Sequence, residues 1–305
     1  IGGFHNFMAF GDFPMAGYGN KDMSTYKFPA GVILNKDLSK VHDVDLENLK
    51  TVEEHVNNSW YDYTGDPNAG KQPWSGETNI NYTGPKPPYE FLDVENKYSF
   101  IKTPRWKGQA MEVGPLARML VGYALGREDF KEVVDSALTK LDVPAEALFS
   151  TLGRTAARGL ETQLVAQWNL EFYDKLIENI KGGDERMANM EKWEVSTWPA
   201  EAKGVGRVEA PRGGLSHWIV IKDGKTENYQ QIVPSTWNAS PRDPKGQRSP
   251  YESTLINTPV ADPELPLEII RTIHSFDPCI ACAVHLYDEK GNIIKEINDV
   301  SVCTV

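Results

Sequence analysis

The longest periodic segment in the chain predicts a single long helix. Between Leu148 and Ile180, apolar side chains recur at every third or fourth position along one face. Pro144 suits the first turn of this helix, and Gly182-Gly183 marks its end. Small residues at positions 153–159 would let neighbouring elements approach closely. We therefore expect an α+β fold with a dominant bundle of long helices and small peripheral β-sheets and hairpins.

The remaining segments divide into a turn-rich first third and a second part in which strands follow helices. Residues 1–105 are dense in Gly, Pro, Asn and Asp, a composition that favours turns and short strands. Apolar spacing predicts further helices at residues 40–59, 111–126, 129–141 and 266–273. A period of two predicts strands at residues 206–210, 217–222 and 228–233, a hairpin turn at Asp223-Gly224, and a second hairpin at residues 286–297.

The charge balance excludes one class of partner. The formal net charge is −11, whereas nucleic-acid binding needs clustered Lys and Arg, so we expect no nucleic-acid partner. No run of eighteen apolar residues is present, so we expect no direct membrane span, and no signal peptide opens the chain. The first residue is Ile1 and not Met, which suggests the continuation of a longer protein.

Two of the three cysteines stand in one short segment, Asp277-Pro278-Cys279-Ile280-Ala281-Cys282-Ala283-Val284-His285. Two thiolates separated by two residues can point at one centre, which suits a soft or borderline metal ion. On spacing alone the pair could also be a redox couple, half of a zinc site, or a chance occurrence.

Three other segments carry polar residues in constrained surroundings. They are Glu112-Val113-Gly114-Pro115-Leu116-Ala117-Arg118, Glu209-Ala210-Pro211-Arg212-Gly213-Gly214, and residues 233–243, in which Ser235 stands on a rigid loop after a strand. Each alone has a structural explanation: a helix start with an ion pair, a turn with a solvated arginine, and a loop whose hydroxyls cap its own backbone.

Together, these four motifs resemble the large subunit of nickel–iron hydrogenases, and most closely the membrane-associated uptake type. The resemblance covers the whole chain but only the C-terminal part of such a subunit. It implies that residues 1–285 are this C-terminal part. It also implies that residues 286–305 are a C-terminal maturation extension, because the mature subunits of this family end at the histidine that corresponds to His285.

The resemblance implies a set of metal ligands. Cys279 corresponds to a terminal nickel thiolate and Cys282 to a thiolate that bridges nickel and iron. His285 and the backbone carbonyl of Gln231 correspond to ligands of a buried Mg²⁺ ion.

The resemblance also assigns the surroundings of the metals. Arg212 would overhang their open face, and Asp277 would pair with Arg212 and hold its orientation. Ser235 and the backbone around Pro211 and Arg212 would donate to the cyanide ligands of an iron that also carries CO.

The implied reaction is the reversible heterolytic cleavage of dihydrogen, in which a hydride goes to the metals and a proton to a nearby base. Either Cys279 or Arg212 could be that base. A metal-bound thiolate is the easier acceptor, because a guanidinium is normally charged at all working pH values.

The resemblance implies several partners. Electrons would pass to an iron–sulfur small subunit, because this chain has no further cysteine set for clusters. The N-terminal half of the large subunit, with another C-x-x-C, would come from a separate chain or an omitted segment. A maturation protease would remove the tail, so we expect an incomplete or empty nickel site while the tail is present. We expect a periplasmic protein that is membrane-associated through partner subunits, or a cytoplasmic one if it is still a precursor.

Two alternatives from other classes stay open. The first is a non-catalytic relative on the same fold, like a subunit of respiratory complex I, although the cysteine pair argues against it. The second is a structural zinc module built from Cys279, Cys282 and His285, for which Asp277 or Cys303 would be a poorly placed fourth ligand. For His217 and His274 we expect structural roles.

Overall fold

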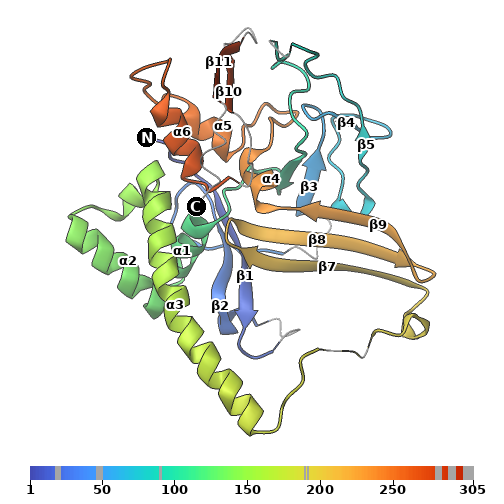
Figure 1. The fold of residues 1–305 in the computed structure, drawn as a ribbon, viewed down its shortest axis with the longest axis vertical. Coiled ribbons are helices and arrows are strands. Elements are labelled where there is room, and N and C mark those ends of the chain that lie inside the picture. Colours follow the sequence, from blue (N-terminus) through green and yellow to red (C-terminus); the bar gives the residue numbers. More distant parts are fainter. Residues whose placement is uncertain are drawn as a thin grey trace.

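The computed structural model describes residues 1–17, 22–45, 51–88, 91–188, 190 and 192–278, and the backbone of two further strands at residues 284–287 and 293–297. A two-stranded antiparallel ribbon runs through the middle of the molecule (Figure 1). It consists of β1 (Phe7–Pro14) and β2 (Tyr26–Ile33). Three helices lie on one side of this ribbon, and a three-stranded sheet lies on the other.

The first half of β1 is buried on both faces, which explains why residues 7–10 are all apolar. Phe7 and Ala9 point into one apolar cluster, to which side chains of the helices on the first side also belong. Met8 and Phe10 point into a second cluster, which contains Trp218 and other buried side chains. Because successive side chains of a strand face opposite sides, this one strand joins the two clusters.

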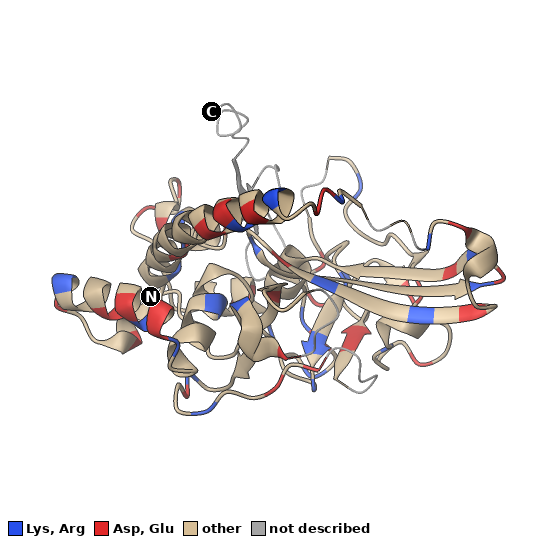
Figure 2. Ribbon diagram, turned by 90° about the horizontal axis from the view of Figure 1, so that it is seen from below, with Lys and Arg blue, Asp and Glu red and all other residues tan. Residues whose placement is uncertain are grey.

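The helices on the first side are α1 (Pro115–Ala124), α2 (Glu128–Leu141) and α3 (Thr151–Lys181). The helices α1 and α2 pack closely at Gly122, where an added Cβ would lie 2.4 Å from the ring of Phe130. The second half of α3 extends away from the body and carries charged residues (Figures 1 and 2). Within the described part of the chain, none of the helices combines the length and apolar character that a membrane span requires.

The sheet on the other side is a meander of β7 (Glu201–Ala210), β8 (Gly213–Lys222) and β9 (Lys225–Ile232). The predicted hairpin turn at Asp223-Gly224 is confirmed, and both residues have positive φ angles. The remaining strands and longer helices are β3 (Val52–His55), β4 (Tyr61–Asp62), β5 (Asn79–Ile80), β6 (Thr103–Trp106), α4 (Pro234–Ala239), α5 (Pro250–Leu255), α6 (Leu267–His274), β10 (Val284–Tyr287) and β11 (Ile293–Ile297).

The combination of helices and small sheets is as predicted, but the dominance of a helix bundle is not confirmed. The β1–β2 ribbon is also central and not peripheral, since residues 7–10 have no exposed surface. The predicted helix at residues 40–59 is wrong where the structure describes this segment. Residues 52–55 form β3, which pairs with β6, because Val52, Glu54 and Val56 are buried with a period of two.

Two further predictions are corrected at the ends of helices. The long helix does not start at Pro144: a short 3-10 turn (Ala145–Leu148) comes first, and the hydroxyl of Ser150 then caps α3 by accepting from the Gly153 amide at 3.0 Å. The segment after β9 is not a loop, because Pro234 opens the short helix α4. The hairpin predicted at residues 286–297 is confirmed as the antiparallel pair β10 and β11.

The contact at Gly122 generates a test of helix packing. We expect Gly122→Ala to lower the free energy of unfolding by about 1–3 kcal/mol, because the new methyl group meets the Phe130 ring. Gly159→Ala in α3 is the matched control: nothing lies within 4 Å of its Cβ position, so the change should stabilise by up to about 1 kcal/mol. Denaturant-induced unfolding measures both, and equal effects of the two changes would contradict the packing argument.

Candidate active site

A cavity of about 380 Å³ lies where the β7–β8 turn meets the end of β9 and the start of α4. Its walls are mainly apolar, and its polar side chains are those of Arg212, Ser235 and Thr236. The lining residues are Ile101, Ala210, Pro211, Arg212, Leu215, Val233, Pro234, Ser235 and Thr236. The cavity thus brings together Pro211, Arg212 and Ser235, which the resemblance implied as one cofactor-binding group.

Arg212 contacts Asp277, as the resemblance implied. Its Nε donates to the Asp277 carbonyl oxygen at 2.6 Å, and its Nη2 lies 3.3 Å from the Asp277 carboxylate. Asp277 has a φ of 53°, in the left-handed region that Asp tolerates better than most residues. The structure shows this contact, whereas the roles of both residues in catalysis stay predictions.

The turn that carries Arg212 fits tightly against the motif at residues 112–118. Gly213 has a φ of 128°, and a Cβ built there would lie 2.6 Å from the backbone nitrogen of Gly114. A side chain at position 213 would therefore be both strained and obstructed. These two glycines let the β7–β8 turn approach the start of α1.

The segment at residues 233–243 is tied to the same motif by Asn238. The Asn238 side chain accepts from the Val113 amide at 3.0 Å and donates to the Val113 carbonyl at 2.9 Å. This paired contact satisfies a buried stretch of backbone and fixes α4, so that Ser235 faces the cavity.

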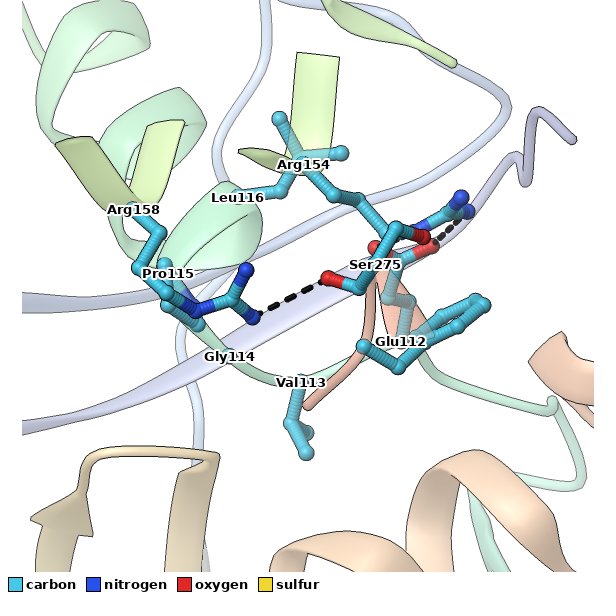
Figure 3. Close-up of a pocket in the computed structure, with 9 residues that line it drawn as sticks. Glu112, Val113, Gly114, Pro115, Leu116, Arg154, Arg158 and Ser275 are labelled. Atoms are coloured by element: carbon cyan, nitrogen blue, oxygen red, sulfur yellow. Dashed lines mark hydrogen bonds and ion pairs between the residues drawn. The ribbon is translucent and has the colours of Figure 1, made fainter. Parts of the chain in front are cut away.

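The start of the cysteine segment is held by arginines of α3 (Figure 3). Arg154 forms a bidentate ion pair with Glu112, at 2.7 and 2.8 Å, and its guanidinium lies 3.9 Å from the centre of the Phe276 ring. Arg158 donates to the Ser275 carbonyl at 3.0 Å. The space between these groups is about 10 Å³, roughly the size of one water molecule. Residues 275 and 276, directly before Asp277, are therefore fixed in place.

Burial and charge oppose each other at these arginines. Burial lowers the pKa of Arg158, although the carboxylate of Asp277 acts in the other direction. Burial would also lower the pKa of Arg118, but the carboxylates of Glu209 and Glu161 outweigh it and raise that pKa. The carboxylates around Arg118 and Arg158 therefore favour the charged form of both guanidinium groups.

Two of the four predicted metal ligands lie outside the described residues. Cys279 and Cys282 lie outside the described residues, and for His285 the backbone alone is described, in β10 opposite Glu296. Gln231 lies in β9 opposite His217 and does not line the cavity. Where side chains are described, no three His, Cys, Asp or Glu residues gather in a group that could hold a metal ion.

A buried ionisable pair next to the cavity was not predicted from the sequence. Lys102, which directly follows Ile101 of the cavity wall, donates to Gln230 at 3.1 Å and lies 4.0 Å from the carboxylate of Glu54. Burial raises the pKa of Glu54 to about 7. The period of two at residues 52, 54 and 56 was the one signal that Glu54 points inward.

The raised pKa of Glu54 predicts a stability that depends on pH. Between about pH 4.5 and about pH 7 the folded chain keeps the Glu54 proton while the unfolded chain loses it, so stability falls as the pH rises through this window. We expect a loss of at most roughly 3 kcal/mol, which Glu54→Gln should abolish. Unfolding measured across the window tests this, with Glu53→Gln on the same strand as the control. An unchanged pH dependence in Glu54→Gln would contradict the assignment.

Comparisons with known proteins identify the family of the chain. The family described as "Nickel-dependent hydrogenase" matches residues 1–285. The uptake hydrogenase large subunit of Bradyrhizobium diazoefficiens is 51% identical over 296 residues, which are 95% of this chain and 49% of that protein. The hydrogenase-1 large chain of Escherichia coli is 45% identical over 93% of this chain and 48% of its own length.

Solved structures give the same result. The reduced, active form of the Ni-Fe-Se hydrogenase from Desulfomicrobium baculatum matches this chain with a TM-score of 0.64 and 33% identity. The match covers 91% of this chain and 51% of the hydrogenase chain. The chain spans about half the length of the curated relatives it matches. The chain therefore belongs to the nickel-dependent hydrogenase family.

Proposed function

We propose that the complete protein cleaves dihydrogen reversibly and heterolytically at a nickel–iron centre. The observation that carries this proposal is that two distant motifs line one cavity and the other two contact the turn that carries Arg212. Gly114 packs against Gly213, and Asp277, two residues before Cys279, contacts Arg212 itself. The match to the nickel-dependent hydrogenase family supports it over a complex I-like relative.

The residues of the cavity fit such a centre. An apolar wall with a guanidinium and a hydroxyl group suits a compact group with anionic ligands, such as an iron that carries CO and cyanide. We propose that Cys279 and Cys282 hold the centre, and that His285 and the carbonyl of Gln231 hold a nearby Mg²⁺ ion. When bound, the centre supplies the site at which the H–H bond breaks and the electrons are accepted.

The protein residues would contribute orientation and proton handling. Asp277 fixes the Arg212 guanidinium, which then presents a permanent positive charge to the cavity. Because the charge is permanent, the sulfur of Cys279 is the better proton acceptor of the two candidates. The apolar lining excludes water and so strengthens these electrostatic interactions.

The proposed reaction needs partners. An iron–sulfur small subunit would take the electrons, and the N-terminal half of the large subunit would supply the remaining thiolates. We propose a periplasmic location with membrane association through partner subunits, since the relatives include uptake hydrogenases.

We propose that residues 286–305 are a maturation extension which a dedicated protease removes. The family match ends at residue 285. The backbone of His285 is paired in β10 with Glu296 of β11, so the proposed Mg²⁺ ligand and the tail share one hairpin. Removal of the tail would free His285 from this pairing.

Replacement of Arg212 tests the proposed function. We expect Arg212→Lys to lower kcat for hydrogen oxidation on the order of a hundredfold, because lysine cannot present the same fixed pair of donors. The assay uses the large subunit assembled with its small subunit. Arg207→Lys, in the same hairpin but outside the cavity lining, is the control and should keep its activity.

Metal analysis tests the centre and the tail together. We expect nickel and iron in equal amounts in a complete large subunit that ends at His285 and is separated from its iron–sulfur small subunit. We expect much less nickel when residues 286–305 are attached. In the subunit that ends at His285, Cys279→Ser should lose nickel. Nickel at full occupancy with the tail in place would refute the maturation proposal, and zinc in place of nickel and iron would refute the proposed centre.

A further inference from the structure

We propose that Arg118 is the positioning residue for Arg212, and that the ion pair with Glu161 of α3 holds the Arg118 side chain in place. The inference rests on the proposed function, in which the direction of the Arg212 side chain matters. It concerns a group that does not line the cavity and that acts through the backbone of the β7–β8 turn.

The hydrogen bonds of Arg118 are saturated. This residue is 1% exposed, and a guanidinium has five N–H donors. Nε and Nη2 donate to the two carboxylate oxygens of Glu161, both at 2.6 Å. The other donors reach Glu209 at 2.7 Å, the Ala210 carbonyl at 2.9 Å and the Pro211 carbonyl at 3.1 Å.

The two carbonyls are the decisive contacts, because they belong to the peptide units directly before Arg212. A peptide unit is planar, so fixing its oxygen fixes the whole plane. The plane that contains the Pro211 carbonyl also contains the backbone nitrogen of Arg212. Arg118 therefore determines the orientation from which the Arg212 side chain leaves the turn.

We call Arg118, its partners Glu161 and Glu209, and the carbonyls of residues 210 and 211 the Arg118 clamp. Glu209 links this clamp to the central β1–β2 ribbon. One Glu209 carboxylate oxygen binds Arg118, and the other accepts from the Phe10 amide at 2.5 Å. The Glu209 amide donates to the carboxylate of Asp12 at 2.8 Å. Hydrogen bonds thus hold the turn against β1, whose side chains contribute to both apolar clusters.

The helix α3 connects this clamp to Asp277. Glu161 holds Arg118, and Arg158, one helical turn earlier, holds the Ser275 carbonyl two residues before Asp277. A rigid helix therefore sets the separation between the two partners of the Arg212–Asp277 contact. The charges balance as well: Arg118, Arg158 and Arg212 face Glu161, Glu209 and Asp277.

The test is Arg118→Lys in the complete large subunit, assembled with its small subunit. Lysine keeps the charge but has three donors, so it cannot hold both carboxylates and both carbonyls. We expect kcat to fall roughly ten- to a hundredfold with an unchanged KM for dihydrogen. A crystal structure of the variant should show the Arg212 guanidinium displaced from Asp277.

A double-mutant cycle separates positioning from general stability. In an Arg212→Lys background, Arg118→Lys should have little further effect on kcat, because its target is already gone. The control is Arg105→Lys: Arg105 is also 1% exposed and binds Asp243 and the carbonyls of Pro104 and Gln247, all outside the cavity lining. It should lower the unfolding midpoint without changing kcat.

Equal losses of kcat in both backgrounds would overturn the proposal, as would an unmoved Arg212 in the crystal structure. If Arg118→Lys does not assemble, Glu161→Gln gives the same test, because it weakens the ion pair but keeps the volume. A wild-type assembly that does not cleave dihydrogen would refute the proposed function alone, since the position of Arg212 is read independently of activity.

Discussion

Backbone carbonyl groups that are not paired within a β-sheet need other hydrogen-bond donors, and this requirement determines how the candidate site is built. The turn at residues 210–212 and the segment before Asp277 both present carbonyl groups inside the protein. Arginine side chains of α1 and α3 donate to them, because a planar guanidinium can satisfy several acceptors at fixed angles. The irregular segments that carry the site are therefore tied by hydrogen bonds to the helices α1 and α3.

Local sequence signals predicted the elements whose contacts are local. The helix α2, the helix α6 and the turn at Asp223-Gly224 agree with the apolar spacing and turn chemistry of their own residues. The segment containing β3 misled the prediction, because its few apolar positions fit a helical and an alternating pattern equally well. Only the pairing with β6, about fifty residues later, decides between them.

In the candidate site too, local sequence patterns did not predict the contacts between residues that lie far apart in the sequence. Pro211, Arg212, Ser235 and Asp277 were assigned through the resemblance, and periodicity alone would have left each as an ordinary turn or loop residue. The clamp around Arg118 was beyond prediction, since its carboxylate partners lie 43 and 91 residues away in the sequence. The motif at residues 112–118 did indicate an ion pair, but not that the pair reaches across to the β7–β8 turn.

The projecting half of α3 has a consequence for how assembly can be followed. Leu170, Tyr173, Leu176 and Ile180 are exposed there, and few tertiary contacts support the backbone hydrogen bonds of these turns. Short helical segments without such support open readily in water. Their amide hydrogens should exchange quickly with deuterium in the chain alone, so slow exchange at these positions would be a direct sign that another polypeptide has closed over them.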